Sequence, residues 1–221
     1  MDAADLVLII IMISLFYFAV YRKSLYGSRG MSKEGLERLK RDDPILHSAL
    51  TKKEFGAYEG ITKWNKKTIT FSVNGDYNQN DLDDVYEVYG KLGKITGLNF
   101  QQVESGADID IKFTDRLKQA HSIVTENPQH IKGLALCSLG MFTSDLENCD
   151  ITIVKDSPLE DVYNVILEES SQSLGVVHDF TEPQMKDSVF YKYKTGSKEK
   201  IKFTAEDRRI LSTLYNDPRF S

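Results

Sequence analysis

The chain has 221 residues, of which 41% are hydrophobic, so it can bury one core of good size. Its formal net charge of −5 at pH 7 argues against a nucleic-acid partner, because a nucleic-acid-binding protein normally presents a basic face. We therefore expect one folded domain with additional segments.

The first element is an apolar segment that begins at Leu6, ends at Tyr21 and contains no charged residue. As a helix rising ~1.5 Å per residue it would be roughly 24 Å long, slightly less than the ~30 Å hydrocarbon core of a bilayer. Acidic residues precede the segment and basic residues follow it, whereas a signal peptide begins with basic residues and ends in small ones. The pattern predicts an uncleaved single-pass membrane anchor within residues 1–23.

Residues 24–62 are polar and charged, with a short helical pattern at residues 33–41, and we interpret them as a juxtamembrane linker. The basic residues that follow the apolar segment are Arg22, Lys23, Arg29 and Lys33. The positive-inside rule then favours a cytoplasmic location for the rest of the chain. We expect the folded domain to comprise residues 63–221.

From residue 63 onward the sequence has the patterns of a folded domain. Apolar residues at strand spacing predict strands at residues 68–73, 98–103, 108–113 and 150–154. A helix is predicted to start at a cap formed by Asn80 or Asp81 and to end at Gly97, with a buried stripe that comprises Leu82, Val85, Tyr89 and Leu92. Residues 114–140 show no regular pattern and are predicted to form a long irregular connection.

Two more helices are predicted in the last third of the chain. The first runs from residue 158 or 159 to about residue 174, with Ser157 as its cap and Pro158 in its first turn. The second runs from Thr204, its cap, to about residue 215. Strands and helices follow one another in mixed order, which predicts an α+β fold.

Cys137 and Cys149 are the two cysteines of the chain, and they lie in a loop-like region. They form a disulfide if the domain is in an oxidising compartment, or stay buried thiols in a reducing one. The sequence leaves both possibilities open.

Residues 168–179, with the sequence EESSQSLGVVHD, have the spacing of the zinc-protease signature H-E-x-x-H-x-x-G-x-x-H-D. In that signature two ligands four residues apart lie on one helix face, and a glycine lets the chain turn toward a third ligand. Glu168, Gln172 and His178 stand at the three ligand positions, and Glu169 stands at the position of the general base.

Together with other pieces in the same order, this segment resembles the metzincin metalloproteases, the matrixin branch in particular. The other pieces are Lys63-Trp64, Gly97-Leu98-Asn99-Phe100, the run ADIDIKF at residues 107–113, Asp187-Ser188-Val189-Phe190-Tyr191 at the Met-turn position, and the helix from Thr204 to Tyr215. The chain is most similar to bacterial matrixin-like domains of uncharacterised function that have E-E-x-x-Q at this place. The resemblance implies a metzincin-like twisted mixed sheet with an upstream helix, an active-site helix and a C-terminal helix, and it favours a domain outside the cytoplasm.

The substitutions at the ligand positions weaken the zinc chemistry that the resemblance implies. Zinc prefers imidazole nitrogen or thiolate, so His178 is the one strong ligand of the three, and Gln172 is expected to hydrogen-bond a neighbour instead. Without a tightly held metal no bound water is acidified toward a pKa of ~7, which leaves Glu169 as a vestigial general base. We expect no resident cofactor, with weak binding of zinc or another divalent cation by Glu168, Gln172 and His178 as the alternative.

Three functions are compatible with these observations. The first is a membrane-anchored, catalytically impaired module that binds a peptide or protein, since matrixin clefts hold peptides by adding a strand to the edge of the sheet. The second is an active metal-dependent peptidase with an unusual Glu/Gln/His site. The third is a membrane scaffold or assembly protein whose function lies in the anchor and the linker.

Overall fold

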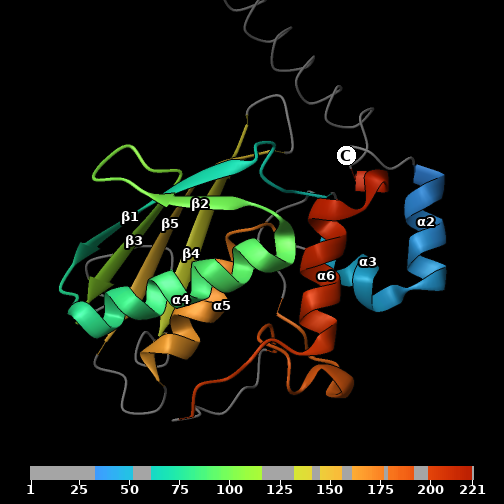
Figure 1. The fold of residues 1–221 in the computed structure, drawn as a ribbon. Helices are drawn as coiled ribbons and strands as arrows, with labels where there is room; N and C mark the ends of the chain where they lie inside the picture. The colour runs from blue at the N-terminus through green and yellow to red at the C-terminus, as the bar shows by residue number, and fades with distance from the viewer. Residues whose placement is uncertain are drawn as a thin grey trace, which may run out of the picture.

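The computed structural model describes residues 33–51, 61–115, 132–140, 145–155, 161–176, 179–191 and 199–220. Within these residues the chain forms a five-stranded sheet and five α-helices (Figure 1). The strands are β1 Thr68–Gly75, β2 Asn99–Gln102, β3 Ile109–Thr114, β4 Gly133–Leu139 and β5 Leu146–Val154. The helices are α2 Lys33–Asp42, α3 Pro44–Thr51, α4 Gln79–Thr96, α5 Val162–Gln172 and α6 Ala205–Asn216. The domain contains both a sheet and helices, which confirms the predicted α+β class in this general sense.

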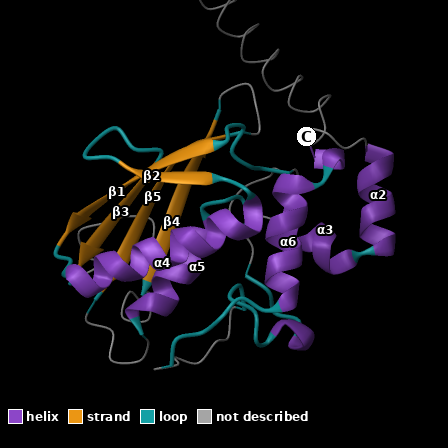
Figure 2. Ribbon diagram, viewed as in Figure 1, coloured by secondary structure: helices purple, strands orange, loops and turns teal. Residues whose placement is uncertain are grey.

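The sheet has the strand order β2-β1-β3-β5-β4. Every neighbouring pair is parallel except β4 and β5, which are antiparallel, so β4 is an antiparallel strand at one edge. Helices α4 and α5 lie across one face of this sheet (Figure 2). The alternation in β3 explains why one face of the sheet is covered and the other is not. Ile109, Ile111 and Phe113 are buried, while Asp110 and Lys112 are exposed.

Helix α4 supplies much of the core beneath the sheet. Its cap is Asn78, whose side chain accepts hydrogen bonds from the amides of Asn80 and Asp81, so the prediction of a cap at Asn80 or Asp81 is wrong by two or three residues. Gly97 ends the helix in the left-handed conformation, as predicted. The predicted core stripe is confirmed, with three of its residues fully buried and Leu82 half-buried against them.

Strand β4 is a correction to the sequence prediction, which placed a long irregular connection over residues 114–140. Its sequence, GLALCSL, alternates weakly and consists mainly of residues without a strong preference for strands. It forms a strand because it pairs with β5 from Gly133 opposite Ile153 to Leu139 opposite Leu146. Tertiary pairing therefore decides the structure of a segment whose local pattern is weak.

Helices α2 and α3 occupy part of the range interpreted as a juxtamembrane linker, and they lie with α6 beyond one end of the sheet (Figure 1). Leu46, Ala49 and Leu50 of α3 belong to the buried core. The carboxylate of Asp43 accepts the amide of Leu46 at the start of α3 and forms an ion pair with Arg209 of α6. Residues 33–51 are thus part of the folded body.

The predicted membrane anchor at residues 6–21 lies outside the described residues. Among the helices that are described, none is both long enough and apolar enough to cross a bilayer.

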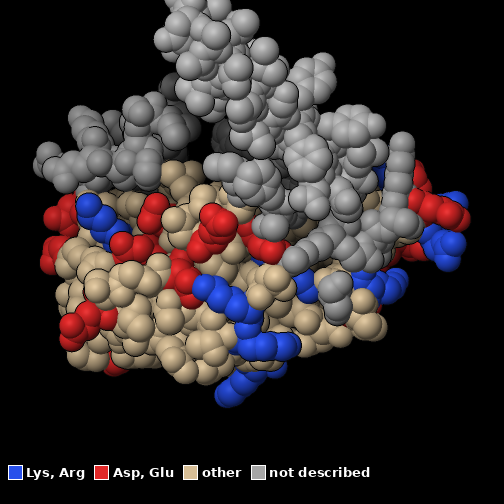
Figure 3. All heavy atoms as spheres, turned by 90° about the horizontal axis from the view of Figure 1, so that it is seen from above, with Lys and Arg blue, Asp and Glu red and all other residues tan. Residues whose placement is uncertain are grey.

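On the surface, acidic and basic side chains share the face seen in Figure 3, with acidic groups in a band across it.

Candidate functional site

Helix α5 carries three of the four predicted site residues. It begins after Asp161, whose side chain accepts the amide of Tyr163 at 2.9 Å, and it ends at Gln172. The predicted cap at Ser157 is therefore wrong, and the helix ends two residues earlier than predicted. The physical reason is that Asp161 offers a carboxylate to the exposed amides at the first turn, which is a strong helix-start signal.

Glu169, predicted to stand at the position of the general base, is buried with an exposed fraction of 7%, whereas Glu168 is half-buried. The side chain of Glu169 packs directly against the backbone of Gly133 at the start of β4. A β-carbon on Gly133 would lie 2.6 Å from the Cγ and Oε1 atoms of Glu169. The absence of a side chain at residue 133 is what allows the edge strand to approach the signature helix this closely.

Gln172 is held in place by a hydrogen bond. Its Nε2 atom donates to Oδ1 of Asp179 at 3.0 Å, which joins the end of α5 to the segment after the signature. This agrees with the expectation that Gln172 hydrogen-bonds a neighbour. His178, the predicted third ligand, lies outside the described residues.

The donors around Gln172 do not fit a tightly bound zinc ion. Glu168 and Gln172 are one turn apart on α5, but they offer a carboxylate and an amide whose nitrogen faces Asp179. Zinc sites in proteins are built mainly from imidazole and thiolate. Among the described residues no group of three or more histidine, cysteine, aspartate or glutamate side chains is arranged to hold a metal ion.

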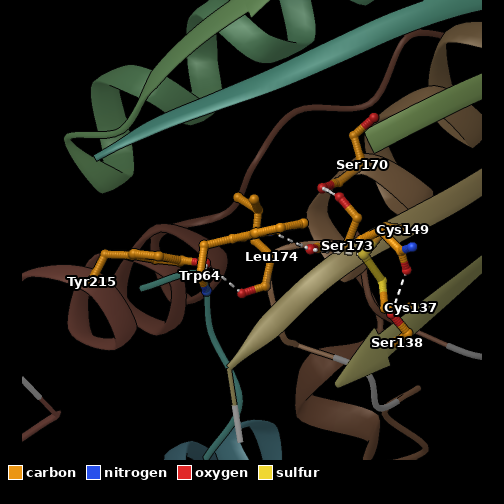
Figure 4. Close-up of a disulfide and its surroundings, with 9 residues drawn as sticks. Trp64, Cys137, Ser138, Cys149, Ser170, Ser173, Leu174 and Tyr215 are labelled. Carbon is orange, nitrogen blue, oxygen red and sulfur yellow. Dashed lines mark hydrogen bonds between the residues drawn. A yellow bond between two sulfur atoms is a disulfide. The ribbon is translucent and has the colours of Figure 1, made fainter. Parts of the chain in front are cut away.

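The chain that leaves α5 is held by Trp64 and Tyr215 (Figure 4). The indole Nε1 of Trp64 donates to the carbonyl of Ser173 at 2.9 Å, and the backbone amide of Trp64 donates to the hydroxyl of Tyr215 at 3.3 Å. That hydroxyl in turn donates to the carbonyl of Leu174 at 2.8 Å. Burial raises the pKa of Tyr215, and the Trp64 amide offsets only part of this, so the hydroxyl stays protonated and can donate.

Gly175 makes the turn that follows these two carbonyls. Its φ is +107°, a conformation that side chains rarely adopt, and a β-carbon there would lie 2.0 Å from the carbonyl oxygen of Thr62. The Lys63-Trp64 pair and the signature glycine therefore form one packed unit, although more than a hundred residues separate them. The predicted turn at this glycine is confirmed.

Cys137 and Cys149 form a disulfide, which settles the alternative that the sequence left open. They face each other directly on β4 and β5, with their Cα atoms 4.0 Å apart. The Sγ atom of Cys149 lies 3.5 Å from the carbonyl oxygen of Ser173 (Figure 4). The disulfide thus packs against the carbonyl that accepts the Trp64 indole.

The short Cα separation also defines which backbone groups of β4 face outward. In an antiparallel pair, closely spaced residues are those that do not exchange hydrogen bonds, so the N–H and C=O of Cys137 point away from β5. By alternation the same holds for Ala135 and Gly133. The hydrogen bond from the amide of Val154 to the carbonyl of Lys132 fits this alternation. In the described part of the chain, no strand pairs with β4 on that outer side.

Asp207 organises the segment at residues 187–191, which is predicted to stand at the position of a Met-turn and in which Phe190 is fully buried. The buried Asp207 carboxylate accepts the hydroxyl of Ser188, the amide of Val189 at 3.3 Å and the amide of Thr204 at 2.8 Å. Sequence reasoning assigned Thr204 correctly as the cap of α6 but gave Asp207 no role. The matching signal was available, because an acidic residue three positions after a threonine is a capping-box pattern.

The described residues thus define a mixed α/β domain whose signature helix is bordered by an unpaired edge strand and tied to a disulfide. A family model with the description "Protein of unknown function (DUF2927)" matches residues 46–220, which is more than half of the chain. The chain belongs to this family. A sequence comparison with curated proteins finds no match.

The packing of Gly175 gives a prediction about stability. Gly175→Ala should lower the free energy of unfolding of the full chain by about 3 kcal/mol, because the alanine needs both a rare φ and displacement of Thr62. Urea unfolding followed by circular dichroism measures this change.

The matched control is Gly90→Ala in α4, where an added β-carbon meets nothing within 4 Å. That variant should gain about 0.5–1 kcal/mol from higher helix propensity. A Gly175→Ala variant as stable as the wild type would contradict the close approach of the two segments.

Proposed function

We propose that this chain is a membrane-anchored peptide- or protein-binding module, built on a metzincin-like fold that has lost its zinc chemistry. The observation that carries the proposal is the outer edge of β4 beside helix α5, where no strand pairs with the backbone within the described residues. An extended peptide binds such an edge by adding a strand to the sheet. Binding of this kind needs no metal ion.

The composition of β4 supports the proposal, because soluble proteins usually protect their sheet edges. The devices that protect an edge are a short strand, charged residues, proline and bulges. Strand β4 has seven residues with neither a charge nor a proline, and its one irregularity lies at its end, between Ser138 and Leu139. The opposite edge, β2, is protected by comparison, since it has four residues and three of them are polar.

The order of the elements supports the metzincin-like part of the proposal. An upstream helix, a mixed sheet, a signature helix and a closing helix follow one another as the resemblance implies. Trp64 and Tyr215 belong to that resemblance, and each donates a hydrogen bond to the chain just after the signature helix. The backbone amide of Trp64 also donates to the hydroxyl of Tyr215. Gln172, by bonding Asp179, replaces a metal-ligand contact with a direct hydrogen bond.

Metal content tests the loss of zinc chemistry. The wild-type full chain should bind no stoichiometric zinc after dialysis, because its donors are mainly oxygen atoms. The double variant Glu168→His/Gln172→His restores the imidazole pattern and should bind zinc at least about 100-fold more tightly than the wild type. Atomic absorption and zinc titration measure both.

Two results would count against this proposal. Stoichiometric zinc in the wild type, with peptidase activity that Glu169→Gln abolishes, would establish the active peptidase instead. If the restored variant bound no more zinc than the wild type while staying folded, residues 168, 172 and 178 would not converge as in a metzincin.

Peptide binding tests the edge of β4. Peptides of twelve residues selected from a random library on the full chain should lose at least about tenfold in affinity for Ala135→Pro, or about 1.4 kcal/mol. The proline removes an outward N–H that an added strand would use, but it leaves the ladder between β4 and β5 intact. Fluorescence anisotropy with a labelled selected peptide measures the affinity.

The control is Gln102→Pro, which places a proline at an outward position of the opposite edge. This variant should bind the same peptide like the wild type. Equal binding by Ala135→Pro and the wild type, or no peptide recovered from the library, would rule out strand addition at β4.

We also propose that residues 6–21 anchor the chain and that the folded domain lies in an oxidising compartment. The disulfide supports a location of the domain outside the cytoplasm, since disulfides persist outside reducing compartments. The basic residues after the segment favour the cytoplasmic side. We give the disulfide more weight because it is a covalent feature of the core, whereas the charge bias rests on a few residues.

A thiol-labelling experiment tests the compartment. The full chain is denatured directly from cells in the presence of a maleimide, with and without prior reduction. We expect Cys137 and Cys149 to react only after reduction. Labelling of both cysteines without reductant would assign the domain to the cytoplasm.

A further inference from the structure

The disulfide lies within the same edge strand that the proposed function uses, and the inference that follows rests on that function. The backbone groups of Cys137 face outward from β4, as do those of Gly133 and Ala135. A covalent bond therefore fixes the strand at one of the positions where a peptide would pair. Whether this bond is oxidised or reduced therefore affects the geometry of the edge strand.

The two cysteine residues differ in exposure. Cys137 is half-buried, whereas Cys149 is 1% exposed and packs beneath the carbonyl of Ser173. An external thiolate therefore reaches the Cys137 sulfur first, and Cys149 is the buried leaving group. Access of this kind decides which sulfur is attacked in thiol–disulfide exchange.

Within the part of the chain that the structure describes, β4 has a paired strand on one edge only. Strand β4 pairs with β5 along one edge and packs on α5 through small residues such as Gly133 and Ala135. Its pairing with β5 is irregular between Ser138 and Leu139, immediately after Cys137. The disulfide is therefore the one covalent link that holds the second half of this strand in register.

We propose that the Cys137–Cys149 disulfide is a redox switch for peptide binding at the β4 edge. A dithiol reductant attacks Sγ of Cys137, the S–S bond breaks, and Sγ of Cys149 leaves with the electron pair and takes a proton. The second thiol of the reductant then attacks the mixed disulfide and releases Cys137 as a thiol. The protein gains two electrons and two protons, and the reductant becomes a disulfide.

Reduction weakens binding because the edge is no longer held in the paired conformation before the peptide arrives. An incoming strand must then order the second half of β4 as it binds, and this ordering opposes association. The oxidised chain has this ordering in place. The reduced Cys149 thiol can donate to the carbonyl of Ser173, so the end of α5 keeps its contacts while the edge strand loosens.

The experiment compares the oxidised and reduced full chain. Its probe is a fluorescein-labelled peptide selected from a random twelve-residue library on the oxidised protein. Reduction with dithiothreitol should weaken binding about tenfold, and re-oxidation should restore it. Hydrogen exchange of the amides in residues 133–139 should speed up on reduction, while exchange in α4 stays unchanged.

The control variant is Cys137→Ser/Cys149→Ser, which should bind the peptide as weakly as the reduced chain and ignore the reductant. Equal binding by the oxidised and reduced wild type would overturn the switch and leave the proposed peptide binding intact. Loss of the whole fold on reduction, seen by circular dichroism, would also overturn it, because the bond would then be purely structural. If the oxidised chain selects no peptide, the proposed function fails and the switch fails with it.

Discussion

The hydrogen bond from the indole of Trp64 to the carbonyl of Ser173 is the contact on which the arrangement of the site depends. A helix leaves its last carbonyls unpaired, and here one of them is buried and satisfied by a side chain 109 residues earlier in the chain. The same approach brings Thr62 against Gly175 and leaves the Ser173 carbonyl beside Cys149. The helix end, the disulfide and the start of the domain are therefore positioned together.

The site differs from a zinc peptidase in what holds the helix to the loop that follows it. In a metal site a cation joins ligands from both, whereas here the amide of Gln172 donates to the carboxylate of Asp179. Glu169 packs against Gly133, so the edge strand lies close beside the helix.

The sequence predicted well those elements whose own residues define them. Strand β3 alternates strictly, α4 has an apolar stripe at helical spacing, and Thr204 has the residues of a capping box. The features that it predicted poorly are those that depend on contacts between residues distant in the chain. Strand β4 has a weak local pattern and exists through its pairing with β5, and the disulfide follows from that register. The burial of α3 likewise depends on α6, and the roles of Gly133 and Asp179 follow only from spatial packing.

The unequal edges of the sheet have a consequence for stoichiometry. Growth of strands into a filament requires two complementary edges on each molecule, because every added copy must offer a new surface to the next. Within the described residues, β4 is open in this sense while β2 is short and polar. If strands add at β4 as proposed, a sheet with one receptive edge gives complexes that close after a single addition, either one guest strand per chain or two chains paired edge to edge about a twofold axis. On that proposal, β4 accepts one added strand without starting the growth of a filament.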